Sequence, residues 1–191
     1  MENPWQTIDN QEVYRNPWIR VTHRQVINPA GNPGIYGVVH FHNLAIGIVP
    51  LDEEGYTWLV GQYRYTIDQY SWEIPEGGCP LGTSPLETAK RELLEETGIS
   101  AGNWTKLLDF HTSNSVTDEA GMVFLAQELS FGAANPEDTE DITVKKVKFS
   151  EALEMVLNGQ ITDALSIMAL FRAKLWLDEQ GQSRECGSVG G

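Results

Sequence analysis

Hydrophobic and polar positions alternate, or run apolar for a few residues, through much of the first half of the chain. Segments 19–27 and 35–41 read as two strands joined by the turn-rich sequence NPAGNPG. The apolar segments AIGIVPL and TWLVGQY flank DEEG, which is a hairpin turn signal, and SWEI adds a short strand. The pattern predicts an N-terminal antiparallel β-segment followed by further strands.

The second half of the chain mixes strand and helix patterns. WTKLLDF, GMVFLAQEL and the alternating ITVKKVKF predict strands, whereas SEALEMVLNG and TDALSIMALFRAKLWL predict helices, the second with Thr162 as a candidate cap. Residues 179–191, EQGQSRECGSVGG, predict a flexible tail. Strands and helices without a regular alternation indicate an α+β fold.

Between these halves lies a Gly-rich loop that leads into a predicted helix over residues 85–97. Ser84 can cap the helix, and Pro85 occupies the first helical position, where its missing N–H costs nothing. Glu87 has the spacing of a capping box, and Gly98 can end the helix in a left-handed conformation. The sequence therefore marks both ends of this helix.

One arc of this helix is apolar and the next is acidic. The apolar positions are Leu86, Ala89 and Leu93. Glu92, Glu95 and Glu96 lie beside them, because residues three and four apart are neighbours on a helix. Crowded carboxylates at a docked face repel one another, and a hard divalent cation such as Mg²⁺ or Mn²⁺ relieves that repulsion. The alternative is an acidic face that is simply solvated.

Composition indicates one globular chain of 191 residues with 41% hydrophobic residues and six Trp. No apolar run is long enough for a membrane span, and no signal-peptide pattern opens the chain. Cys79 and Cys186 do not form a disulfide framework, so we expect reduced thiols and a cytoplasmic protein. A net charge of −14 argues against nonspecific nucleic-acid binding.

The segment from Gly77 to Ile99 resembles the Nudix box, which reads G, five residues, E, seven residues, then R-E-apolar-x-E-E-x-G-apolar. The matching positions are Gly77, Arg91, Glu92, Leu93, Glu95, Glu96, Gly98 and Ile99. One position departs from the pattern, since Thr83 stands where the family has its first Glu. Thr83 can still form a hydrogen bond near the helix start and share capping with Ser84.

From about Trp18 to Leu177 the chain is similar to the ADP-ribose pyrophosphatase branch of the Nudix hydrolases. QYRY followed by WEIPEGG resembles the segment before the box, and DFHTSNSVTDE resembles a Ser-Pro-Gly loop with Asn114 and Ser115 in place of Pro and Gly. The resemblance implies a Nudix αβα sandwich over residues 43–178. It also implies an N-terminal antiparallel β-segment domain over residues 1–42, through which members of this branch commonly form homodimers.

The resemblance also implies roles for individual residues. Glu92 and Glu96 would hold the cation together with the backbone carbonyl of Glu76, and Glu95 would share in metal binding or support it. Arg91 would aim the glutamates. The loop EDTEDITV resembles the acidic loop that supplies the catalytic base, which places the base at Glu140.

Three further residues are candidates for substrate contacts. Arg64 would bind a phosphate, Trp72 would stack on a base, and Glu119 would contact the ribose or the metal. The plainer interpretations are a solvated Arg64, a core Trp72 and a solvated Glu119. His40 and His42 share a face of one predicted strand, but no third ligand accompanies them, so a metal site there is disfavoured.

The implied reaction is metal-dependent hydrolysis of the diphosphate of a nucleoside diphosphate sugar. ADP-ribose is the expected substrate, with AMP and ribose 5-phosphate as products. One alternative is a sibling specificity such as GDP-mannose. Another is a sensor that binds a nucleotide sugar without cleaving it, although the intact Arg91-Glu92 and Glu95-Glu96 pairs argue against this.

Overall fold

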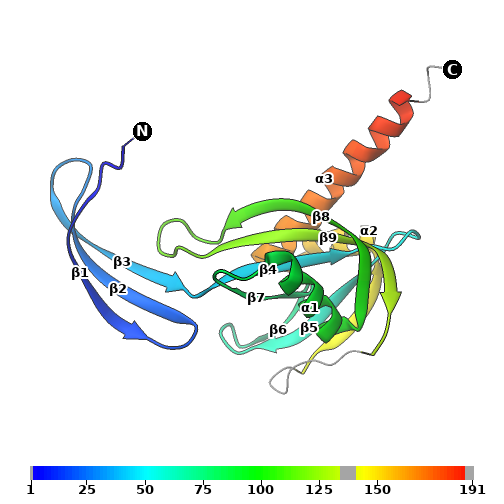
Figure 1. Ribbon diagram of the computed structural model, residues 1–191, viewed down its shortest axis with the longest axis horizontal. Helices are drawn as coiled ribbons and strands as arrows, with labels where there is room; N and C mark the ends of the chain where they lie inside the picture. Colours follow the sequence, from blue (N-terminus) through cyan, green and yellow to red (C-terminus); the bar gives the residue numbers. More distant parts are fainter. Residues whose placement is uncertain (1, 134–140, 188–191) are drawn as a thin grey trace.

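The computed structural model describes residues 2–133 and 141–187 of the chain, and it arranges their strands in three sheets (Figure 1). The strands are β1 (Gln6–Arg15), β2 (Ile19–Ile27), β3 (Pro33–Phe41), β4 (Asn43–Pro50), β5 (Tyr56–Arg64), β6 (Gln69–Glu73), β7 (Glu76–Pro80), β8 (Ile99–His111), β9 (Ala120–Phe131) and β10 (Thr143–Lys148). The helices are α1 (Pro85–Thr97), α2 (Phe149–Leu157) and α3 (Ala164–Gly187).

A mixed sheet in the order β7-β4-β9-β8 separates two hydrophobic cores. Strand β4 is apolar from Leu44 onward, as expected for a strand that is buried on both faces from Ile46 to Pro50. Ile46 and Ile48 pack with Leu93 of α1 on one face, whereas Val49 packs with Leu170 of α3 on the other. Helix α1 therefore covers one face of this sheet and α3 the other, which confirms the αβα sandwich.

A second sheet, β10-β5-β6, completes this body of the molecule. The turn predicted at DEEG connects β4 of the first sheet to β5 of this one, and the Asp52 carboxylate accepts hydrogen bonds there from the N–H groups of Glu54 and Tyr56 at 3.0 and 2.8 Å. Gly55 adopts the left-handed φ of 78° that the turn requires.

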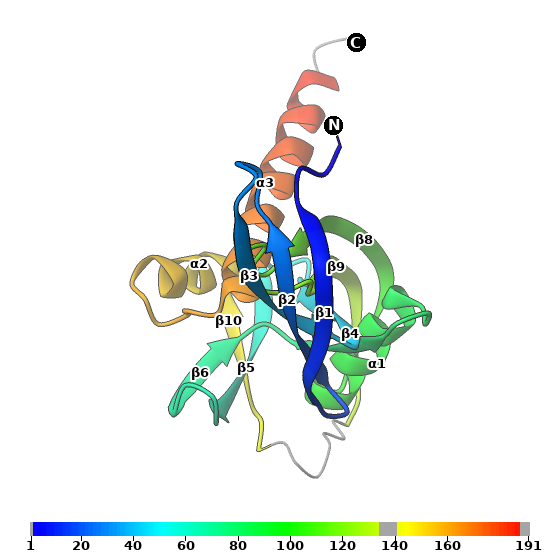
Figure 2. The same ribbon diagram turned by 90° about the vertical axis from the view of Figure 1, so that its left-hand side faces the viewer.

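The N-terminal strands β1, β2 and β3 form a separate antiparallel sheet that stands to one side of the sandwich (Figures 1 and 2). The expected division after residue 42 falls between β3 and β4 and stays a prediction. The sequence of β1, QTIDNQEVYR, has no hydrophobic alternation, so the sequence pattern did not predict this strand, and all of its residues are exposed.

Three other elements differ from the predicted ones. Residues 76–80, expected as loop, form β7, and Cys79 is buried in it rather than lying in a loop. Helix α3 continues to Gly187, so residues 179–187 of the expected tail are helical. The cap of α3 is Asp163 rather than Thr162, because the Asp163 carboxylate accepts the N–H of Ser166 at 2.6 Å.

Candidate active site

Helix α1 begins and ends where its sequence signals indicate. The N–H of Glu87 donates to Ser84 Oγ at 3.4 Å, and the N–H of Gly98 donates to the carbonyl of Leu94 at 2.9 Å. Gly98 has a φ of 70°, which closes the helix in the left-handed region. Thr83 does not share the cap, because its hydroxyl donates to the carbonyl of Pro80 at 2.7 Å.

The acidic arc of α1 is docked against the body rather than solvated. Glu96 is only 2% exposed, and Glu92 and Glu95 are partly buried. By contrast, Glu87 and Lys90 form an exposed ion pair at 2.8 Å on the outer side of the helix. Burial of a carboxylate requires compensating partners, so the simple solvated face is excluded for Glu96.

Gly77 of β7 lies against the Glu92 side chain of α1. A Cβ atom built on Gly77 would lie 2.2 Å from Cδ of Glu92 and 2.3 Å from its Oε1. No side chain fits there without displacing the Glu92 carboxylate. The glycine that opens the box is therefore required by the position of a glutamate fifteen residues later in the chain.

Arg91 holds two carboxylates of the same helix. Its Nη2 lies 2.5 Å from Glu92 Oε1, and its Nη1 lies 2.6 Å from Glu95 Oε2. Partial burial alone would lower the pKa of Arg91, but the two carboxylates raise it above its ordinary value. Arg91 thus forms an ion pair with each of the two glutamates.

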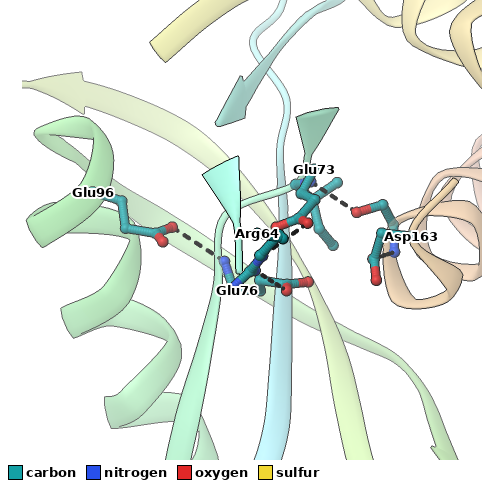
Figure 3. A network of polar contacts seen from close by, with 7 residues as sticks. Arg64, Glu73, Glu76, Glu96 and Asp163 are labelled. Carbon is teal, nitrogen blue, oxygen red and sulfur yellow. Dashed lines mark hydrogen bonds and ion pairs between the residues drawn. The ribbon is translucent and has the colours of Figure 1, made fainter. Parts of the chain in front are cut away.

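A buried polar network continues from α1 across the ends of β5, β6 and β7 (Figure 3). The N–H of Glu76 donates to Glu96 Oε2 at 3.1 Å, and the Glu76 side chain accepts from Arg64 Nη2 at 2.7 Å. Arg64 also pairs with Glu73, with Nε lying 3.0 Å from each carboxylate oxygen. Arg64, expected at a phosphate, therefore lies between two carboxylates.

This network lines a pocket of about 420 Å³ beside the N-terminal end of α3. Glu73, Glu76 and Asp163 face it, with Arg64 as the cation among them. Burial and the negative charges of Asp163 and Glu73 raise the pKa of Glu76 well above its ordinary value, against the opposing charge of Arg64. Hydrogen bonding and charge from Glu73 raise the pKa of Arg64.

The donor atoms of this region fit a hard divalent cation. They are carboxylate and carbonyl oxygens, which Mg²⁺ and Mn²⁺ prefer. Glu76 Oε2 is buried and makes no hydrogen bond, and three carboxylates raise the pKa of this group, so positive charge is in deficit. Among residues 2–133 and 141–187, no three His, Cys, Asp or Glu side chains already form a metal cage.

The structure brings some of the predicted site residues together and leaves others apart. Glu76, Glu92, Glu96 and Arg91 lie around the junction of α1 and β7, as described above. Trp72 lies on the opposite face of β6 from Glu73 and contacts Tyr70 edge-on, with ring centroids 5.5 Å apart.

The remaining candidates lie elsewhere. Glu119 precedes β9, in the loop after β8, and its proposed contact stays a prediction. Glu140 lies outside the described residues. His40 and His42 do not face a common site, because His40 pairs with Asp118 while His42 Nδ1 lies 2.9 Å from the carbonyl oxygen of Pro17.

Sequence reasoning missed Glu73 and Asp163. Glu73 is 3% exposed within the apolar stretch SWEI, and a charge inside such a stretch signals a paired, buried group. Asp163 stands three residues before Ser166, which is the spacing of an N-cap, but the neighbouring Thr162 is also a good capping residue and was the predicted cap.

Comparison with known proteins decides the family. The model of the NUDIX domain matches residues 41–168, which include α1, β7 and Arg64. The chain belongs to the Nudix hydrolase family. A model described as the nucleoside diphosphate sugar hydrolase N-terminal domain matches residues 5–39, which include β1, β2 and most of β3.

Relatives with established names cover most of this Nudix chain. It is 33% identical over 170 residues to an ADP-ribose pyrophosphatase of Mycobacterium tuberculosis, covering 87% of this chain and 81% of that protein. It is also 33% identical to an ADP-ribose pyrophosphatase of Bacillus subtilis, covering 86% and 89%. The crystal structure of an ADP compounds hydrolase matches with a TM-score of 0.84 and 22% identity, covering 93% of this chain and 96% of that one. This likeness confirms the fold.

Proposed function

We propose that this Nudix hydrolase cleaves the diphosphate of ADP-ribose to give AMP and ribose 5-phosphate, with Mg²⁺ or Mn²⁺. The observation that carries the proposal is the docked carboxylate group at the junction of α1 and β7, where Gly77 admits Glu92 and the N–H of Glu76 binds Glu96. The names of two relatives at 33% identity support ADP-ribose as the substrate.

Glu92, Glu96 and the backbone carbonyl of Glu76 would hold the cation, with Glu95 beside them. When bound, such an ion neutralises diphosphate charge and lowers the pKa of a coordinated water. Arg91 keeps Glu92 and Glu95 in fixed orientations through its two ion pairs. Glu140 would accept the proton of the attacking water, a role that typically contributes about 10²–10⁴-fold to the rate.

Arg64 is proposed to bind a substrate phosphate. Its guanidinium carries five N–H donors, and its pairs with Glu73 and Glu76 fix the plane of the group. A phosphate would share this cation with the two carboxylates. Trp72 and Glu119 are proposed to contact the base and the ribose.

We further propose a cytoplasmic homodimer that forms through the N-terminal sheet. Large apolar side chains of this sheet and of its β1–β2 turn are exposed, among them Ile8 at 65%, Ile35 at 67% and, in the turn, Trp18 at 68%. Such a surface is typical of an interaction site. Within the described residues, no helix is both long and apolar enough to cross a bilayer.

A release assay over a panel of nucleotide sugars, with Mg²⁺ and with Mn²⁺, tests the proposed function. We expect ADP-ribose to give the highest kcat/KM. Glu96→Gln should remove most activity while the chain stays folded, since the amide oxygen can still accept the Glu76 N–H. Glu87→Gln, an exposed change on the same helix, is the matched control.

GDP-mannose belongs in the panel because the chain is 37% identical over 93 residues to a GDP-mannose pyrophosphatase of Pectobacterium atrosepticum. Faster release from GDP-mannose would replace the substrate but keep the reaction. Binding of a nucleotide sugar with no turnover in either metal would support a sensor instead.

A further inference from the structure

The loop between β8 and β9 is fastened to the N-terminal sheet of the same chain. The N–H of Val39 donates to the carbonyl of Val116 at 2.9 Å, and the N–H of Asp118 donates to the carbonyl of Val39 at 3.2 Å. These bonds extend the edge of β3 by a short parallel bridge between Val39 and Thr117. The loop therefore takes its course from a sheet that is distant in sequence.

His40 is the side chain at the centre of this junction. Its Nδ1 lies 2.5 Å from Asp118 Oδ2, and its Nε2 lies 3.0 Å from Thr22 Oγ1 and 3.3 Å from Arg24 Nη2. Arginine can only donate, so Nε2 accepts and Nδ1 carries the proton that is donated to Asp118. The second carboxylate oxygen of Asp118 accepts the N–H of Phe41 at 3.1 Å.

Thr22, His40 and Asp118 place a hydroxyl, an imidazole and a carboxylate within hydrogen-bond distance of one another in that order, as in a nucleophile with its base. This group is nevertheless not arranged to react. Thr22 is 1% exposed, so no substrate reaches its hydroxyl. The lone pair of His40 Nε2 is already engaged by the guanidinium of Arg24. These contacts, together with the burial of His40, which is only 8% exposed, hold its imidazole in one orientation. The fixed imidazole in turn holds the Asp118 carboxylate in place.

Asp118 and Glu119 are the last two residues before β9, which begins at Ala120. In β9, Gly121 is opposite Ala45 of β4, and Ala45 is opposite Gly78 of β7. The loop thus enters the sheet two strands from Gly78, the neighbour of the box glycine Gly77, which is about 10 Å at the spacing of neighbouring strands. A base, two phosphates and a sugar together span such a separation.

We propose that His40 and Asp118 are positioning residues for the nucleotide sugar. They hold residues 112–119, and with them Glu119, at the edge of the site, although neither residue touches the reacting atoms. This inference rests on the proposed function. It makes the N-terminal sheet part of the substrate site within one chain, besides any part it has in dimer formation.

The test compares His40→Gln, Asp118→Asn and the double variant with the wild-type enzyme in kcat, KM and Tm, using ADP-ribose and Mg²⁺. In Asp118→Asn the amide NH₂ must face either Phe41 N–H or His40 Nδ1–H, so one of the two bonds to residue 118 is lost. We expect KM to rise about tenfold with kcat nearly unchanged. The loss in the double variant should be smaller than the sum of the two single losses, because both changes act on the His40–Asp118 pair.

The matched control is His23→Gln, a histidine of β2 that points to the opposite face of the sheet from Thr22 and Arg24, where its Nε2 lies 3.4 Å from Gln25 Nε2. It should leave both constants unchanged. Tyr36→Phe is a milder variant, since it removes only the hydroxyl that donates to the carbonyl of Ser115 at 2.8 Å. It should raise KM in the same direction by a smaller factor.

An unchanged KM in the His40, Asp118 and Tyr36 variants overturns the inference, as does a fall in kcat alone. A wild-type chain that hydrolyses no nucleotide sugar would instead refute the proposed function. In that case the Kd for ADP-ribose decides. Binding weakened about tenfold by Asp118→Asn and not by His23→Gln upholds the positioning role, and equal or undetectable binding overturns it.

Discussion

At the scale of single residues, a substitution at Gly77 should affect activity much more than stability. The three atoms nearest to its would-be Cβ all belong to the Glu92 side chain, so Gly77→Ala can be accommodated by moving that side chain. We predict a free energy of unfolding within about 1 kcal/mol of wild type and a loss of activity of at least about tenfold. Gly37→Ala, with nothing within 4 Å, is the control. Wild-type kcat/KM in Gly77→Ala would show that the position of Glu92 does not matter.

Glu76 gives a second prediction at this scale, concerning pH. Its pKa is raised in the folded protein above the ordinary 4.5, so the folded state binds the proton more tightly than the unfolded state. Ionising Glu76 therefore lowers the free energy of unfolding as the pH rises from about 4.5 through the folded-state pKa. Glu76→Gln removes this penalty.

Urea unfolding in EDTA at several pH values measures the effect. The stability of Glu76→Gln relative to wild type should increase as the pH rises through this window and then level off. Glu87→Gln, which changes an exposed carboxylate of α1, should show no such trend. A difference between Glu76→Gln and wild type that is constant with pH would mean that Glu76 is not destabilised by its neighbours.

At the scale of elements, helix α1 depends on its C-terminal glycine. Gly98 has a φ of 70°, and a side chain there is strained. Gly98→Ala should destabilise the protein by about 1 kcal/mol in urea unfolding. Gly181→Ala is the opposite-sign control, because this glycine lies inside α3 with open space around it, and alanine favours the helix. Equal effects of the two changes would contradict the role of Gly98 as a cap.

At the scale of the whole molecule, the exposed apolar side chains of the N-terminal sheet should decide assembly. Ile35→Glu should convert a dimer to a monomer in light scattering, since a buried unpaired carboxylate at an interface is costly. Leu157→Glu is the control, because Leu157 is 76% exposed at the end of α2, away from that sheet. If Ile35→Glu remains dimeric, the interface lies elsewhere.

The sequence predicted those parts of the fold that depend on local signals. Helix α1 has its cap, its first-turn proline and its terminal glycine in the chain itself, and both of its ends are where they were expected. Strand β1 carries no such signal, because its sequence QTIDNQEVYR does not alternate apolar and polar residues. Strand β7 was hidden because its glycines are characteristic of loops, although its pairing with β4 makes it a strand.

The sequence by itself determined the family, the α1 helix and the cluster of glutamates on one arc of it, because these follow from residue types at fixed spacings. Only the tertiary structure decided which charges meet. Glu73, Arg64 and Asp163 come from β6, β5 and the start of α3, and His40 meets Asp118 across 78 residues of chain. Such pairs depend on how the sheets and helices pack against one another, and the spacing of residues along the chain does not predict this packing.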